Sequence, residues 1–290
     1  MENELQRTEA IERYLRRGII PKQRSLVSKN GIFLPTRMSD CIFAKCREYP
    51  LQNLITRETT GSLKNKVPFR YSNITLDWVE EGESFPLANF ELGGKEFIFN
   101  KAGGIIKISE NLFLDSYFNV QDFISTSFGH ALGEELEKVF IAGDANKKPA
   151  GFIHDCSKVD ASGPNITTID IQRVFTTLKT KYIENASWLV SQKVFFDLDV
   201  LADDNGNKLM SPGSSEADGY LLGKPVHITF MPEYNPLSFG DYSYYKALDK
   251  PLELKRLNEL FVVEGFIGFR LVYFADGKLL DSDAIVTLEI

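Results

Sequence analysis

"SYFNVQDFISTSFGHALGEELEKVFIAGDANKKPAGFI", residues 116–153, contains the strongest structural signal of this chain. Residues 116–141 predict one long helix, because an apolar side chain returns at every fourth position. The recurring residues are Val120, Ile124, Phe128, Leu132, Leu136 and Phe140. Each step of four residues turns about 400°, so the apolar stripe drifts by about 40° per step along a rod of about 39 Å. We expect Asp115 and Ser116 to cap the start of the helix and Gly143 to end it.

The loop that follows this helix, residues 143–151, carries Gly143, Lys147 and Lys148 and therefore resembles a phosphate-binding loop at first sight. A phosphate loop precedes a helix, because the N-terminal end of a helix carries the positive end of its dipole. This loop follows a helix and meets the negative end. We therefore interpret it as a turn whose lysines are solvated.

The clearest strand signal is in residues 261–275, FVVEGFIGFRLVYFA, where one face is apolar along the whole run. Fifteen residues of strand span about 50 Å, which matches the long helix in scale. We expect this helix to lie on a long sheet. Asp276-Gly277 predicts a tight turn after the strand, and residues 283–290, DAIVTLEI, predict a last strand.

Residues 166–245 alternate between helix and strand signals and predict a compact α/β module. The segment 168–183, TIDIQRVFTTLKTKYI, predicts a helix with one apolar side. SWLVSQKVF (187–195) predicts a buried strand, DDNGN (203–207) a turn and KPVHITF (224–230) another strand.

The N-terminal third of the chain has fewer apolar side chains to bury. Residues 4–17 predict a short amphipathic helix that Gly18 ends, and residues 19–55 read as an extended arm with scattered apolar anchors. Residues 66–80 predict a strand. The segment from Trp78 to Ser109 predicts a long two-stranded excursion with alternation at Phe97 and Phe99. A lone hairpin is marginal in water, so it needs a neighbour to rest on.

Composition excludes several classes of protein. The net charge is −7 with a pI of about 5.2, which disfavours a protein that wraps nucleic acid. A basic N-terminal segment, from Arg13 to Arg24, is more simply a solvated helix face and tail. Three cysteines do not make a disulfide framework. The chain has no signal-peptide core and no apolar run of membrane length, so a soluble protein of a reducing compartment is expected.

Sequence motifs for chemistry are missing, so we assign no catalytic, cofactor-binding or metal-binding residue. No P-loop, dinucleotide-binding or nucleophile-elbow pattern occurs. A calcium loop over residues 201–212 fails at both terminal ligand positions. His154, Cys156, Cys41 and Cys46 could be imagined as a zinc set, but their spacings match no usual motif.

Several segments share a family pattern when they are taken in chain order. They are EAIERYLRRG (9–18), YPLQNLITRETT (49–60), the excursion 78–109, the helix and loop of 116–153, ASWLVSQKVFFDLDVLADDNGNKL (186–209), LLGKPVHITFMPE (221–233) and LSFGDYSYYKALDK (237–250). In this order they resemble the major capsid protein family of tailed bacteriophages, which has the Hong Kong 97-type fold.

The resemblance implies an α+β fold with four parts. An N-terminal arm would cover residues 1–55, and an extended β-hairpin loop would cover 78–109. A peripheral domain, with the long spine helix on a long β-sheet, would take 56–77, 110–155 and 248–283. An axial α/β domain, near the five-fold and six-fold axes, would take 156–247 and 284–290.

The resemblance also implies a function. The chain would be a non-enzymatic major capsid protein that self-assembles into the icosahedral shell around phage DNA. Its partners would be its own copies in pentamers and hexamers, portal, scaffolding and head-completion proteins, and double-stranded DNA bound without sequence specificity. It would use no cofactor, contact no membrane, assemble in the bacterial host cytoplasm and reside in the virion capsid.

Candidate subunit contacts are implied by the same resemblance. They are Phe85, Pro86, Phe97, Phe99, Asp144 and Pro149. Asp144 and Pro149 would fix the turn after the spine helix. Acidic residues in place of Phe97 and Phe99 are expected to impair assembly while the subunit stays folded.

Two other functions fit parts of the sequence. An encapsulin-type compartment shares the fold but encloses cargo protein, and DNA-free particles filled with an enzyme would favour it. A cytosolic α/β hydrolase or transferase could be built on residues 156–247, and a dispersed monomer with a deep pocket would favour that.

Self-cross-linking is not expected. Some members of the family join subunits between a lysine that precedes a proline in the extended loop and an asparagine of a neighbour. Here Phe85 precedes Pro86, and alignment on the long strand puts Glu264 in place of the asparagine. Assembled particles boiled in detergent should therefore run as one monomer band on a gel, and a ladder of covalent oligomers would contradict this prediction.

Overall fold

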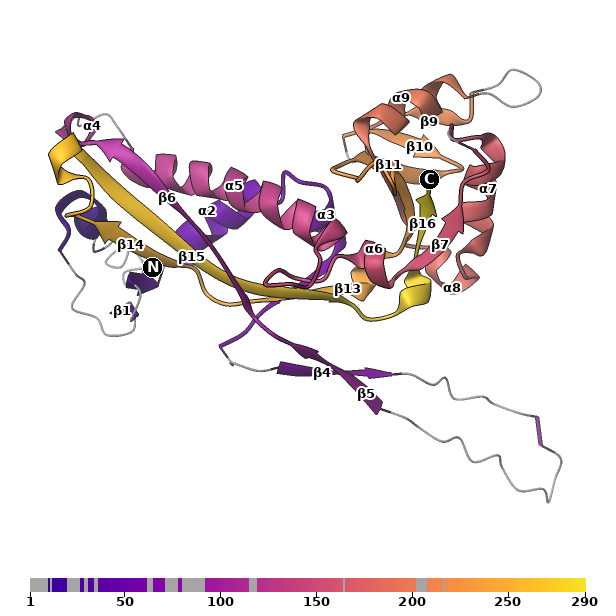
Figure 1. Ribbon diagram of the computed structural model, residues 1–290, viewed down its shortest axis with the longest axis horizontal. Helices are drawn as coiled ribbons and strands as arrows, with labels where there is room; N and C mark the ends of the chain where they lie inside the picture. The colour runs from indigo at the N-terminus through magenta and orange to yellow at the C-terminus, as the bar shows by residue number, and fades with distance from the viewer. Residues whose placement is uncertain are drawn as a thin grey trace.

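The computed structural model of the chain describes most of its residues (Figure 1). They are 10, 12–19, 27–28, 31–33, 36–61, 65–70, 78–79, 92–114, 119–163, 165–201, 208–215 and 217–290. The described elements form two seven-stranded sheets and a separate two-stranded sheet. Helical residues at 12–17 end at Gly18, whose N–H donates to the carbonyl of Tyr14.

The spine helix is α5, Val120–Ala142. All six residues of the predicted stripe are buried, which confirms the helix and its periodicity. The predicted start is wrong by four residues, because the side chain of Asn119 caps the helix by accepting from the N–H of Asp122. The proposed caps Asp115 and Ser116 lie outside the described residues. Gly143 follows the last helical residue, as predicted.

Two glycines let α5 approach helix α2, Thr36–Cys46. A Cβ at Gly129 would lie 2.5 Å from the Cβ of Lys45 and 2.9 Å from the carbonyl oxygen of Ile42. A Cβ at Gly133 would lie 3.0 Å from the Cα of Cys46. The close contact also lets the Cys46 thiol donate to the Gly129 carbonyl at 3.4 Å. The side chains of α2 therefore pack directly on the backbone of α5.

The first seven-stranded sheet, called here the long sheet, is organised around β15, Phe266–Leu279. One edge of β15 pairs over ten residues with β6, Asn100–Ser109. The other edge pairs first with β14, Glu253–Leu257, and then with β13, Tyr245–Asp249. β3 (Thr56–Thr59) runs parallel to β13, while β2 (Gly31–Phe33) and β1 (Val27–Ser28) continue from β14. In Figure 1, α5 runs along this sheet.

Two sequence predictions about β15 are wrong. The strand begins at Phe266 and not at residue 261, because Val262–Glu264 form a 3-10 turn and Gly265 takes a positive φ of 70°. Asp276-Gly277 is not a turn but lies inside the strand. Glycine is needed there because a Cβ at Gly277 would lie 2.2 Å from the Tyr245 hydroxyl.

The second sheet forms the other end of the molecule (Figure 1). Its order is β7 (Ser157–Asp160), β16 (Ile285–Glu289), β12 (Leu237–Gly240), β8 (Ser187–Val190), β11 (Lys224–Ile228), β10 (Gly219–Leu221) and β9 (Met210–Pro212). Helix α7 (Thr168–Thr177) packs on it, with Phe175 stacked on Phe239, which in turn stacks on Trp188. This confirms the predicted α/β module.

Two boundaries in this module were predicted wrongly. The helix predicted over residues 168–183 is interrupted, because Leu178 and Lys179 are extended between α7 and α8, Thr180–Ile183. The strand SWLV ends at Val190, and residues 192–200 form helix α9, Gln192–Val200. Ser191 causes the change, because its hydroxyl accepts from the N–H of Val194 and caps the helix. The predicted turn at 203–207 lies outside the described residues. The remaining short elements are α3 (Leu51–Leu54), α4 (Glu110–Leu114), α6 (Phe152–Asp155), α8 (Thr180–Ile183), and the 3-10 turns at Tyr242–Tyr244 and Ser282–Ala284.

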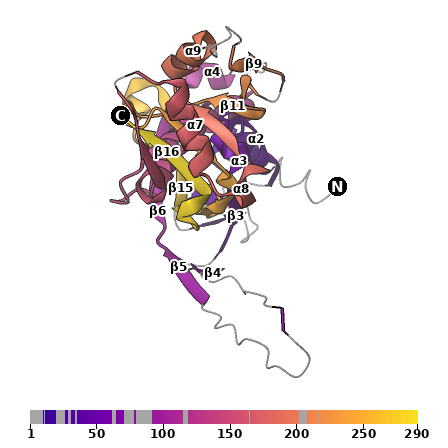
Figure 2. The same ribbon diagram turned by 90° about the vertical axis from the view of Figure 1, so that its right-hand side faces the viewer.

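A two-stranded hairpin stands apart from both sheets. β4, Asn65–Arg70, pairs with β5, Leu92–Phe97, and the pair projects from the body in both views (Figures 1 and 2). The expected excursion therefore exists but has different limits. Asn100–Ser109 does not return along the hairpin, because its backbone pairs with β15.

The close packing at the glycines of α5 can be tested by substituting alanine. Alanine in place of a helical glycine usually stabilises by about 1 kcal/mol. Gly129→Ala should instead destabilise by about 1–3 kcal/mol, because the added methyl overlaps Lys45 and Ile42. Chemical unfolding of the unassembled subunit measures this. Gly163→Ala is the control, since a Cβ there meets nothing within 4 Å. A stabilised Gly129→Ala variant would contradict the packing described here.

Candidate subunit-contact surfaces

The described residues were expected to hold no metal site. No three His, Cys, Asp or Glu side chains in the described ranges are arranged to hold a metal ion, so the imagined zinc set is not brought together. Burial raises the pKa of both the Cys46 and Cys156 thiols to about 11, which keeps them protonated near neutral pH. No helix in the described part of the chain is long and apolar enough to cross a membrane.

The root of the hairpin, where the chain passes from β5 to β6 of the long sheet, is fixed to β15. Phe97 has 0% exposed surface. The N–H of Ile98 donates to Oδ2 of Asp276 at 2.8 Å, and the Lys95 ammonium donates to the carbonyl of Leu279. This changes the expectation for Phe97. An acidic residue there would put a charge inside the subunit's own core, so the subunit would not stay folded.

Phe99 also belongs to the root. It is half-buried, and the Lys250 ammonium lies 4.6 Å from the centre of its ring and 5.5 Å from that of Phe274. Such contacts are favourable because the ring face is negative. The alternation at Phe97 and Phe99 was read correctly, but it could not tell whether the same chain or a neighbour covers the rings. Phe85 and Pro86 lie outside the described residues.

The turn after the spine helix is built as predicted. Asp144 Oδ1 accepts from the N–H of Asn146 at 3.1 Å, and Asp144 pairs with Ala150 in an isolated bridge. Pro149 is buried, whereas Lys147 and Lys148 are exposed. A Cβ at Gly143 would lie 2.2 Å from the Pro149 carbonyl oxygen, so glycine is required. The outward face of this turn remains a candidate contact.

An apolar tip caps the far end of the long sheet, between β14 and β15. Leu260, Val262 and Val263 are exposed, and Val263 is fully so at 102%. Glu264 pairs with Lys107 at 2.9 Å, and the Lys107 ammonium lies over the ring of Phe261 at 4.3 Å. Sequence reasoning missed this tip because it placed residues 261–264 in the strand. Gly265 was the available signal for a turn.

A groove lies between α5 and β6. It has a volume of about 270 Å³ and is lined mainly by apolar side chains. They include Ile106, Phe128, Ala131, Leu132 and Leu136. Among the described strands, β6 pairs on one edge only, with β15. An unpaired edge beside an apolar groove suits an extended segment, which could pair with the strand and place alternate side chains in the groove.

Glu137 links the spine helix to α3 and to the second sheet. Its carboxylate is buried and accepts from the N–H of Leu51 at 3.1 Å, the amide of Gln52 at 3.3 Å and the hydroxyl of Thr229 at 2.5 Å. Burial raises the pKa of Glu137, and these donors oppose the shift. Leu51 lies in α3 and Thr229 follows β11, so one side chain joins α3, the spine helix and the second sheet.

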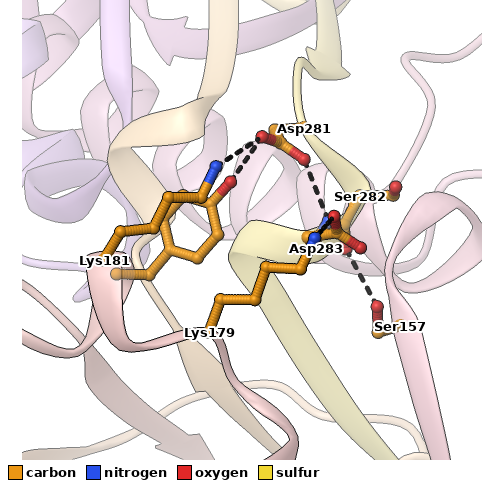
Figure 3. A network of polar contacts seen from close by, with 7 residues as sticks. Ser157, Lys179, Lys181, Asp281, Ser282 and Asp283 are labelled. Atoms are coloured by element: carbon orange, nitrogen blue, oxygen red, sulfur yellow. Dashed lines mark hydrogen bonds and ion pairs between the residues drawn. The ribbon is translucent and has the colours of Figure 1, made fainter. Parts of the chain in front are cut away.

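A polar network surrounds the turn between β15 and β16 (Figure 3). Asp281 accepts from the hydroxyl of Tyr182 and from the N–H of Asp283, and it lies 3.5 Å from the Lys181 ammonium. Asp283 also pairs with Lys179. Burial alone would raise the pKa of Asp281, but these donors outweigh it and lower the pKa. The network ties α8 to the turn that leads into β16.

Comparison with known proteins places these surfaces in context. The sequence matches the model of the phage capsid family over residues 30–290. No curated protein matches it. The capsid of the native GTA particle, computed with C5 symmetry, is 18% identical with a TM-score of 0.67, covering 94% of this chain and 95% of that chain.

Two further solved structures come from named phages. A chain of Microbacterium phage Oxtober96 is 12% identical with a TM-score of 0.64, covering 93% of this chain and 95% of that chain. A chain of Mycobacterium phage Bobi is 14% identical with a TM-score of 0.60, covering 96% of this chain and 97% of that chain. Together, these likenesses confirm the expected α+β capsid fold.

The Figure 3 network predicts a pH dependence. Because the folded pKa of Asp281 is lowered, its contribution is present above the unfolded value of about 3.9 and is lost as the pH falls through the folded pKa. Asp281→Asn should therefore lower the free energy of unfolding by about 1 kcal/mol at pH 7. The stabilities of the two proteins should converge as the pH falls from about 4 through the folded pKa of Asp281.

Denaturant unfolding across this pH range measures the difference. Asp199→Asn is the matched control, because it breaks only an exposed pair with Lys208 and should change stability by less than about 0.5 kcal/mol. A pH-independent difference for Asp281→Asn would show that the carboxylate charge is not involved.

Proposed function

The chain belongs to the phage capsid family, and on this basis we propose how its surfaces build a shell. It is a major capsid protein, the subunit of an icosahedral shell, and its place is the virion capsid. The family match favours this function over an encapsulin-type compartment and over a cytosolic enzyme. A shell of this kind requires each subunit to contact several copies of itself through defined surfaces.

We propose that the subunit is divided much as the resemblance implied. The peripheral domain would be the long sheet with α5, and the axial domain would be the second sheet with α7 and α9. Two observations support different limits for the other parts. α2 packs on α5, so residues 36–55 would belong with the peripheral domain. β6 belongs to the long sheet, so the extended loop would span residues 65–97.

The observation that carries the assembly mechanism is the projecting hairpin. Among the described strands, β4 and β5 pair only with each other, and beyond the root at Lys95–Phe97 they project from the body (Figure 2). Two strands alone are marginal in water, so the hairpin would gain stability by lying on a neighbouring subunit. The groove between α5 and β6 is the best-suited receiving surface, because it is apolar and bordered by an unpaired strand edge among the described strands.

The apolar tip would supply a second contact. Leu260, Val262 and Val263 lie at the opposite end of β15 from the hairpin root, so each subunit would touch neighbours at both ends. Individual contacts of this size are weak, but a shell repeats them many times and multivalency adds their effects.

We propose the remaining roles on the same basis. The subunit would be purely structural and use no cofactor. Portal, scaffolding and head-completion proteins would be its partners during assembly in the host cytoplasm. The net charge of −7 supports a wall that does not adhere to packaged DNA, since affinity for phosphate comes from basic surface.

The apolar tip gives the sharpest test of assembly by surface contact. Val263→Asp should leave the subunit folded, because the side chain is fully exposed. It should reduce the yield of closed particles by about tenfold or more, since burying a valine is worth about 1.5 kcal/mol or more. Sedimentation and electron microscopy measure the yield, and thermal unfolding checks the fold. Val263→Ile is the control and should assemble normally. Full yield from Val263→Asp would refute a contact at the tip.

A further inference from the structure

The chain leaves the long sheet at one defined point. The backbone pairing of β6 with β15 ends at Asn100 and Ala275. Asp276 is the next residue of β15, and its Oδ2 accepts from the N–H of Ile98 at 2.8 Å. A side-chain carboxylate thus continues the hydrogen bonding where the backbone ladder stops, and its partner Ile98 is the residue that directly follows the hairpin.

The Asp276 carboxylate is buried, and both its oxygens are engaged. Asp276 is 3% exposed, and its Oδ1 accepts from the N–H of Gly277 at 2.9 Å. Burying a carboxylate is costly, and hydrogen bonds to a charged acceptor are stronger than neutral ones. A buried carboxylate therefore adds little to the stability of the fold. It does favour one local geometry strongly, because any other geometry would leave the charge without its hydrogen-bond donors.

A second tie makes the direction of β5 definite. The Lys95 ammonium donates to the carbonyl of Leu279, three residues further along β15 than Asp276. Phe97 lies between the two ties and is fully buried. Two fixed points on one strand and a buried ring between them leave the root little freedom to rotate.

The hairpin converts a small change at this root into a large displacement. The six residues of β5 reach about 20 Å, so a tilt of about 10° at the root moves the far end by about 3.5 Å. Contacts between packed surfaces are lost over such distances, because dispersion and apolar burial act only at close range.

We propose that Asp276 is the positioning residue of the extended hairpin, which sets the angle at which the hairpin leaves the subunit and thereby the geometry of the shell. This inference rests on the proposed function, namely that the hairpin contacts a neighbouring subunit. Asp276 acts through Ile98 and is itself buried, so it takes no part in the contact.

The test compares Asp276→Asn with a matched buried aspartate. Asparagine keeps the size of the side chain but cannot accept at both positions, so one N–H loses its partner. Amide hydrogen exchange at Ile98 should become about tenfold faster or more, while exchange within α5 is unchanged. Particles should still form, but the fraction with the normal diameter should fall by about fivefold or more, because each shell repeats the error many times.

The control is Asp170→Asn. Asp170 is also fully buried and accepts from Ser162 and Thr167, but it caps α7, the helix that packs on the second sheet. Asp170→Asn should lower the stability of the subunit and the total yield of particles without broadening the distribution of particle diameters. If Asp276→Asn gives fewer particles of uniform diameter, as the control does, Asp276 is merely structural and the proposal fails. Should Asp276→Asn not fold, Lys95→Met removes the other tie, and normal diameters from it would overturn the proposal equally.

A truncated hairpin separates this inference from the proposed function. Val67 and Lys95 are paired, so Asn-Gly in place of residues 68–94 would remove most of β4 and β5, keep Lys95 and Phe97 at the root, and close the chain by a two-residue turn. If this variant assembles normally, the hairpin is not a contact and both proposals fall. If it does not assemble while Asp276→Asn gives normal shells, the hairpin contact stands and only the role of Asp276 is refuted.

Discussion

Backbone pairing on both edges of β15 positions every other part of this subunit. β6 occupies one edge, while β14 and β13 occupy the other in succession. A strand held in this way cannot bend or slip without breaking backbone hydrogen bonds on both sides. The apolar tip precedes its first residue, the hairpin root lies at residues 276–279, and the Asp281 network comes after its end. Every proposed contact is thus placed relative to one rigid strand.

Buried carboxylates mark the joints between these parts. Glu137 joins α5, α3 and the second sheet, and Asp276 joins β15 to the hairpin. Asp249 accepts from the Tyr273 hydroxyl at 2.9 Å and lies 3.5 Å from the Arg57 guanidinium, which links β13, β15 and β3. Apolar packing tolerates small rotations, whereas a buried charge with several donors does not. Their shared position at joints indicates that they fix orientation rather than add stability.

Elements with a periodic apolar pattern could be predicted from the sequence, whereas boundaries set by single capping or turn residues could not. The stripe of α5 was visible because a helix that lies on a sheet needs an apolar face. The start of α5 was predicted too early, because the cap is Asn119. The start of β15 was also predicted too early, because Gly265 takes a left-handed conformation that ends the preceding turn. Asp276-Gly277 has the composition of a turn, but glycine occurs there because the Tyr245 ring leaves no room for a Cβ. The contact surfaces were the least predictable, since alternation at Phe97 shows that a ring is covered without showing by which chain.

Under the proposed assembly, affinity and geometry would be supplied by different parts of this subunit. Apolar contacts at the tip and in the groove are non-directional and roughly proportional to the area they bury. They can hold copies together but cannot by themselves select one curvature. Hydrogen bonds to buried charges are directional, and here they lie at the root of the element that reaches furthest from the body. A closed shell needs both, because adhesion without a fixed angle gives aggregates of many shapes, and a fixed angle without adhesion gives free subunits.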